Sequence, residues 1–130
     1  MTTPFWTVLI AILIPFFLAL LNDLLRFRQF GVLDNNHPRE QTAKLTGLGA
    51  RVWAAQQNAW EALIMYIPSV LIAHITGADP VQSTYAAIVF CIARISHSTF
   101  YLLDFSTLRS ASYFVALACC LRFFWLAANA

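Results

Sequence analysis

The sequence places a guanidinium, side-chain amides and a carboxylate within one short stretch of an otherwise apolar chain. The stretch runs from Ala50 to Leu63 and reads ARVWAAQQNAWEAL. On a helix, Arg51, Asn58 and Glu61 fall within about 80° of one another and therefore share one face. Such a face can bind a ligand that carries carboxylates and amides of its own, because arginine holds a carboxylate through two parallel hydrogen bonds.

Two further stretches offer polar faces of the same kind. Arg94, His97, Ser98 and Tyr101 lie within an arc of about 100° on a helix. Further along, Arg109 is followed one helical turn later by Tyr113. Taken alone, any one of these residues can be a packing contact between membrane helices, worth about 0.6 kcal/mol. Together they exceed what helix packing requires, and we interpret them as the walls of one ligand pocket.

The elements that must position these faces are predicted to be membrane helices. The chain is 60% hydrophobic and only 11% charged, and its mean hydropathy is +0.68, whereas about a quarter of the residues in soluble domains are charged. Four apolar stretches are each long enough to cross about 30 Å of hydrocarbon. We predict an all-α integral membrane protein, a single four-helix domain over residues 1–130 with helices at about 3–27, 42–75, 81–103 and 108–128. No internal repeat supports a transporter.

Charges in the connections predict the orientation of the four helices. Basic residues crowd the first connection, Arg109 flanks the third, and the second has none. The positive-inside rule then puts the first and third connections in the cytoplasm, with both termini and the second connection outside. The net charge of +2 is too small and dispersed to suggest nucleic-acid binding. Cys119 and Cys120 point about 100° apart on a helix, so we expect no metal site there.

Glu61 and Arg94 are expected to reach comparable depths in the membrane from opposite directions. An unpaired charge near the centre of a membrane helix costs about 2.5–3.5 kcal/mol. We therefore predict an ion pair between these two side chains.

In their order and spacing, three motifs resemble the MAPEG family, the membrane-associated proteins of eicosanoid and glutathione metabolism. They are Arg51-(x)4-Gln56-x-Asn58-(x)2-Glu61, Ala93-Arg94-(x)2-His97-(x)3-Tyr101 and Leu108-Arg109-Ser110-(x)2-Tyr113. The chain is most similar to short bacterial members, whose loop has a segment like Asn36-His37-Pro38-Arg39 before Leu45-Thr46-Gly47. The resemblance covers nearly the whole chain.

The resemblance implies a homotrimer in the bacterial inner membrane, with periplasmic termini and glutathione bound between protomers near the cytoplasmic side. It implies a glutathione transferase or peroxidase that uses glutathione as thiol co-substrate, requires no metal and acts on a lipophilic electrophile or hydroperoxide. Arg109 matches the arginine that stabilises the thiolate, assisted by Tyr113 or Ser110. The expected glutathione-binding residues are Arg51, Gln56, Asn58, Glu61, Arg94, His97 and Tyr101. The different direction of Gln56, about 140° from Arg51 on a helix, fits a site between protomers.

One position departs from the family's best-studied enzymes. Ala54 stands where those enzymes have an arginine that contacts a glutathione carboxylate. The loss of such a contact weakens binding by orders of magnitude unless Arg26, Arg28 or Arg39 replaces it. The alternative to an enzyme is therefore a non-catalytic protein on the same scaffold, which binds a lipid or another thiol or joins a larger membrane complex.

Overall fold

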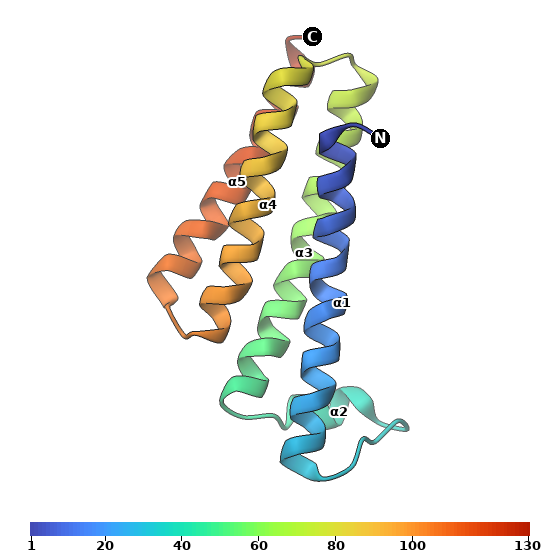
Figure 1. Cartoon of the computed structure of the whole chain (residues 1–130), viewed down its shortest axis with the longest axis vertical. Helices are drawn as coiled ribbons and strands as arrows, with labels where there is room; N and C mark the ends of the chain where they lie inside the picture. Colours follow the sequence, from blue (N-terminus) through green and yellow to red (C-terminus); the bar gives the residue numbers. More distant parts are fainter.

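The structure, a computed structural model, describes all 130 residues and consists of five helices joined by short connections. The four long helices lie side by side (Figure 1). Both chain termini lie at one end of this bundle, here called the termini end, and the short helix lies at the other, the loop end. In chain order the helices are α1 (Thr3–Phe30), α2 (Pro38–Ala43), α3 (Leu48–Ile75), α4 (Pro80–Leu102) and α5 (Ser106–Ala128).

The outer surface of the bundle is apolar, as expected for helices that cross a membrane. All four long helices are long and apolar enough to span one, and only 22% to 39% of the most apolar window of each is buried inside the protein. Large side chains such as Phe17, Leu20 and Ile64 are at least 70% exposed. A bilayer is the solvent in which such a surface is stable, so the prediction of an all-α membrane bundle is confirmed.

The hydrophobic core packs the four long helices against one another in the half of the bundle nearest the termini end. Helix α1 packs along α3, and α4 packs along α5. The rings of Tyr66 and Phe90 stack with their centroids 3.5 Å apart, and Phe123 meets Tyr66 edge-on. The Thr7 hydroxyl donates to the carbonyl of Pro4, so the Tyr66 hydroxyl donates to Thr7 Oγ1 across 2.6 Å. This bond satisfies a buried polar group inside the membrane.

At the loop end the structure corrects two predicted helix boundaries. Helix α1 continues to Phe30 rather than ending near residue 27, and Gly31 ends it in the left-handed region at φ 76°. The second predicted helix, over 42–75, is two helices with a break between them. Gly47 has φ 55° and ψ −125°, a conformation that no helix contains and that glycine adopts most easily, so α3 begins only at Leu48.

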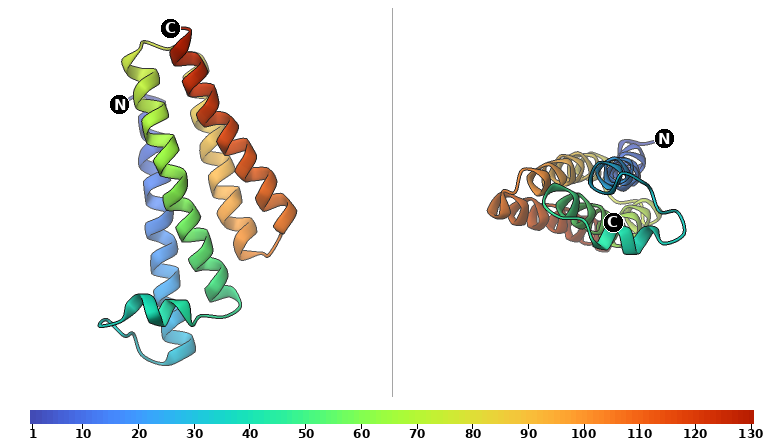
Figure 2. Two further views of the ribbon diagram at one scale, coloured as in Figure 1. Left: turned by 180° about the vertical axis from the view of Figure 1, so that it is seen from behind. Right: turned by 90° about the horizontal axis from the view of Figure 1, so that it is seen from below.

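Arg26 fixes α2 against the end of α1. Its guanidinium donates to Asp23 Oδ1 at 2.8 Å, to Gln41 Oε1 at 3.0 and 2.8 Å, and to the carbonyl of Asp34 at 3.2 Å. Gln41 also donates to the carbonyl of Val32 at 2.8 Å. Because these contacts use Nε, Nη1 and Nη2 of Arg26, its role is to hold the loop. Figure 2 shows α2 beneath the α1 and α3 pair and apart from the turn between α4 and α5.

Asp34 organises the turn that precedes α2. Its carboxylate accepts hydrogen bonds from the backbone N–H groups of His37, at 3.0 Å, and Asn36, at 2.9 Å. These bonds favour the charged form, and that from His37 contributes most to lowering the pKa of the Asp34 carboxyl below its usual value.

Candidate functional site

A cationic and aromatic cluster lies where α4 and α5 meet near the loop end. The guanidinium carbon of Arg109 lies 4.4 Å from the ring centroid of Tyr101, a cation–π contact. His97 is 3% exposed, and its Nδ1 lies 2.9 Å from the backbone carbonyl oxygen of Arg109. A carbonyl only accepts hydrogen bonds, so Nδ1 carries a proton. The other ring nitrogen, Nε2, is buried without a hydrogen-bond partner.

The guanidinium of Arg109 and the hydroxyl of Tyr113 have no polar partner within the protein. Neither group makes a side-chain hydrogen bond, and no carboxylate lies within 4.0 Å of Arg109. Tyr113 is 41% exposed, and its ring lies 6.3 Å from that of His97. Ser110 is exposed, and its hydroxyl donates back to the carbonyl of Ser106 at 3.1 Å. Arg109 and Tyr113 can therefore bind an anionic or hydrogen-bonding ligand, whereas the proton of Ser110 is already used.

The predicted ion pair between Glu61 and Arg94 is wrong. Arg94 is 2% exposed, and its Nη2 donates to the backbone carbonyl of Asn58 at 3.1 Å and to Asn58 Oδ1 at 2.9 Å. Glu61 stays exposed and accepts a 3.4 Å hydrogen bond from Asn58 Nδ2. Asn58 supplies two neutral acceptors to the buried cation, so the carboxylate does not need to leave the surface to meet it.

A narrow cleft, here called the Arg94 cleft, lies between α3, α4 and α5. It opens beside the hydrogen bonds that join Arg94, Asn58 and Glu61. It has a volume of about 80 Å³, and Asn58, Glu61, Arg94 and Tyr113 lie along it with the apolar side chain of Met65. Pockets that bury whole small molecules measure roughly 300–1,000 Å³. The cleft of one chain is therefore too small to enclose a whole small molecule by itself.

Arg51 joins the first polar stretch to the turn between α4 and α5. Its Nε donates to the carbonyl of Leu102 at 3.4 Å, and its Nη1 lies 3.8 Å from Asp104 Oδ2. Asp104 sits in the left-handed region at φ 64°, which turns the chain from α4 into α5. Arg51 thus fixes the turn that precedes Arg109, and its guanidinium already has a carboxylate within reach inside the chain.

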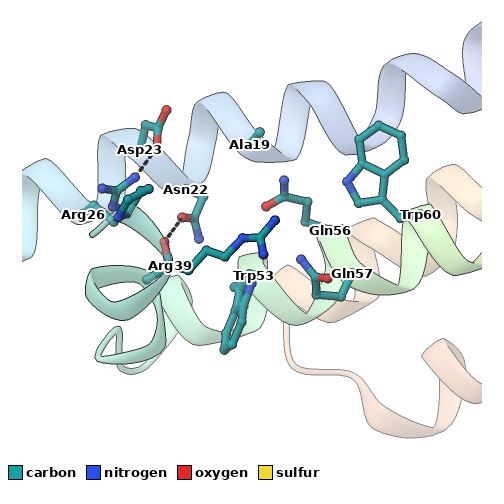
Figure 3. A pocket seen from close by; sticks show the side chains of 11 residues that line it. Ala19, Asn22, Asp23, Arg26, Arg39, Trp53, Gln56, Gln57 and Trp60 are labelled. Atoms are coloured by element: carbon teal, nitrogen blue, oxygen red, sulfur yellow. Dashed lines mark hydrogen bonds and ion pairs between the residues drawn. The ribbon is translucent and has the colours of Figure 1, made fainter. Parts of the chain in front are cut away.

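Gln56 lies on a different side of α3, in a second and larger cavity called here the Arg39 pocket. This pocket measures about 530 Å³ and lies between α1, α2 and α3. In Figure 3 the Arg39 guanidinium reaches into it toward Gln56 and Gln57. Unlike Arg26, Arg39 makes no hydrogen bond or ion pair. The pocket is completed by Ala19, Asn22, Asp23, Arg26, Pro38, Thr42, Trp53 and Trp60.

Asn22 is a residue of the Arg39 pocket that the sequence did not single out. It is only 4% exposed, and its Oδ1 accepts a 3.3 Å hydrogen bond from Thr42. Its Nδ2 is buried without a partner. The sequence signal that could have identified Asn22 is its position, an asparagine close to the end of the first apolar stretch. Asn22 becomes buried in the pocket only because α2 folds over it, which hydropathy does not predict.

The sequence of the chain was compared with models of known protein families. A family model described as the MAPEG family matches residues 3–129. The chain belongs to the MAPEG family. A search among curated proteins found no match. The four apolar helices and the family make this MAPEG protein an integral membrane protein of a family concerned with glutathione metabolism. All three polar motifs lie inside the matched residues.

Proposed function

We propose that this MAPEG protein is a glutathione-dependent transferase or peroxidase that acts on lipophilic electrophiles or hydroperoxides. The observation that carries the proposal is the Arg109 guanidinium, which rests on Tyr101 with no carboxylate to neutralise it. A guanidinium beside a thiol favours the thiolate, which is the nucleophile in conjugation. Tyr113, one turn further along α5, has a free hydroxyl to hydrogen-bond the sulfur.

Conjugation and peroxide reduction both begin with attack by this thiolate. In conjugation its lone pair forms a carbon–sulfur bond while the leaving group departs with its electron pair. In peroxide reduction the thiolate attacks one peroxide oxygen and the alkoxide leaves, taking up a proton to become the alcohol. A second glutathione then reacts with the resulting sulfenic acid, giving the disulfide and water. Both reactions suit a bilayer, in which lipophilic substrates are concentrated.

The complete site is proposed to lie between neighbouring protomers of a homotrimer. The Arg94 cleft of one chain is too small for a tripeptide, whereas the Arg39 pocket presents Gln56 on another side of α3. A neighbour that turns its Arg39 pocket toward the Arg94 cleft completes the site from two chains. Symmetric oligomers commonly bury such unlike surfaces against each other in a closed ring.

Arg39 is the proposed replacement for the arginine that Ala54 lacks. Of the three arginines considered for this role, Arg26 is fully engaged by the loop. Arg28 is exposed and lines neither cavity. Arg39 has free donors and lies in the pocket with Gln56, so it can bind a glutathione carboxylate from the neighbouring side.

The proposed orientation puts the loop end in the cytoplasm of a bacterium and the protein in its inner membrane. Arg26, Arg28, Arg39 and Lys44 all lie at that end, in or beside the connection between α1 and α3. Cytoplasmic loops carry such an excess of basic residues. Glutathione is then drawn from the cytoplasm, and the lipophilic partner from the bilayer.

A non-catalytic scaffold is the second candidate, favoured by Ala54 and by the engagement of Arg51 with Asp104. Ala54 stands in place of one arginine that would bind glutathione, and Asp104 engages the guanidinium of another. In this case the polar faces hold a lipid or another thiol without turnover.

Calorimetry with glutathione, combined with conjugation of chlorodinitrobenzene, separates the two candidates. We expect the purified protein to bind glutathione with a dissociation constant below the millimolar range and to accelerate conjugation. The matched ligand is the analogue in which serine replaces the glutathione cysteine, which is expected to bind without reacting. Binding of glutathione without conjugation supports the scaffold. No binding at millimolar glutathione contradicts the proposed function.

A further inference from the structure

Arg122 stands apart from every other basic residue of the chain. The sequence contains eight lysines and arginines. Seven lie at the loop end or in the half of their helix nearest to it, whereas Arg122 lies in the second half of α5, near the termini end. The membrane–water interface is where a long basic side chain near a helix end places its charge.

Neutral groups hold the Arg122 guanidinium in place. Its Nη2 donates to Gln82 Oε1 on α4, and its guanidinium carbon lies 4.2 Å from the ring centroid of Trp125. No carboxylate lies within 4.0 Å of it. The cation is therefore ordered but not neutralised, and it has further donors for an anion.

An apolar groove leads from Arg122 toward the middle of the bundle. It has a volume of about 460 Å³ and lies between α4 and α5. Gln82 and Arg122 lie at the end nearest the termini, and Val89 and Val115 at the opposite end. Val89 follows Gln82 by seven positions, which corresponds to about 10 Å along the helix. The small side chains of Ala86 and Ala118 leave the hollow between these ends.

The charges at this depth favour a lipid over a second copy of the chain. Asp79 is the only side-chain carboxylate near the termini end, and its Oδ1 accepts the backbone N–H of Gln82 at 2.7 Å as the cap of α4. In copies that cross the membrane in the same direction, the only side-chain carboxylate at this depth is therefore Asp79, one oxygen of which already caps α4. Phospholipid phosphates lie at this interface with acyl chains below them, and arginine binds phosphate through two hydrogen bonds.

We propose that the groove between α4 and α5 binds one anionic phospholipid of the leaflet at the termini end. The phosphate is held by Arg122 and Gln82, and the upper part of an acyl chain lies between Ala86 and Ala118. This site is on the far side of α5 from Tyr113 and is independent of the proposed glutathione chemistry.

Native mass spectrometry of the detergent-purified protein tests this site with phosphatidylglycerol and phosphatidylcholine of identical acyl chains. We expect phosphatidylglycerol to remain bound preferentially, and Arg122→Gln to weaken its binding about tenfold. Arg122→Lys, which keeps the charge, retains part of the preference. Ala118→Leu fills the groove and weakens both lipids. Arg28→Gln is the matched control, an exposed arginine at the loop end that leaves binding unchanged.

Three results would overturn the proposal. Equal retention of the two lipids by the unmodified protein removes the role of the headgroup. An equal loss on Arg28→Gln shows general attraction to the protein's charge. A change of oligomeric state on Arg122→Gln, seen in the same spectra, makes the groove an interface between copies.

Discussion

Replacing Arg109 by alanine is expected to slow glutathione conjugation by about two to three orders of magnitude, the usual effect of removing one preorganised group that stabilises developing or resident negative charge. The Arg109 guanidinium, at the loop end of α4 and α5, lies over the ring of Tyr101 and has no carboxylate partner within the chain. Without it the bound thiol returns toward the pKa of free glutathione, so the rate profile moves to higher pH. Steady-state conjugation of chlorodinitrobenzene across a pH series measures both effects.

Arg109→Ala is expected to leave the surrounding structure largely intact, so a change in rate can be assigned to the lost guanidinium. The hydrogen bond from His97 goes to the backbone carbonyl of residue 109, and alanine keeps that carbonyl. Arg109→Lys preserves the charge and is expected to recover part of the rate. Arg28→Ala removes an exposed arginine elsewhere and leaves the rate unchanged. If Arg109→Ala conjugates as fast as the unmodified protein at every pH, Arg109 does not activate the thiol.

Replacing Asn58 by alanine is expected to lower the free energy of unfolding by about 1.5–3 kcal/mol, the range for a hydrogen bond to a charged group. The substitution removes Oδ1 as an acceptor and leaves the buried guanidinium of Arg94 with only the backbone carbonyl. Thermal unfolding in detergent, followed by circular dichroism, measures the change relative to the unmodified protein.

Two substitutions on the same helix serve as controls for Asn58. Gln57→Ala removes a neighbouring exposed amide that makes no hydrogen bond and is expected to change stability little. Glu61→Gln is also expected to have a small effect, because the carboxylate is exposed and reaches Arg94 only through Asn58. A larger loss on Glu61→Gln than on Asn58→Ala would show that the charge of Glu61 stabilises Arg94 directly.

Hydropathy and helical angle predicted the architecture because both depend on single helices. A run of apolar residues long enough to cross the bilayer must form a helix, and the angle between two side chains on it follows from their spacing. This is why four spans and the shared faces of Arg51, Asn58 and Glu61 follow from sequence. It is also why Gln56 was expected to point elsewhere on α3.

Contacts between helices were harder to predict because they depend on the register of one helix against another. Arg94 meets Asn58 rather than Glu61, although the two candidates lie only about 4.5 Å apart along α3. Gln82 and Arg122 are forty residues apart, and nothing in the sequence around either residue predicts the hydrogen bond between them. The break before α3 depends on the conformation of Gly47, which removes four residues from the helix without interrupting the apolar pattern.

Activity of mixed trimers tests the shared glutathione site most directly. One variant carries Arg39→Ala with Gln56→Leu, the other carries Arg109→Ala, and each alone is expected to conjugate glutathione poorly. When the two are co-expressed in equal amounts and assemble at random, about a quarter of the sites combine an intact Arg39 pocket with an intact Arg109. We predict that the mixture recovers about that share of the unmodified conjugation rate. A mixture no more active than the two variants measured separately would contradict a site built from two protomers.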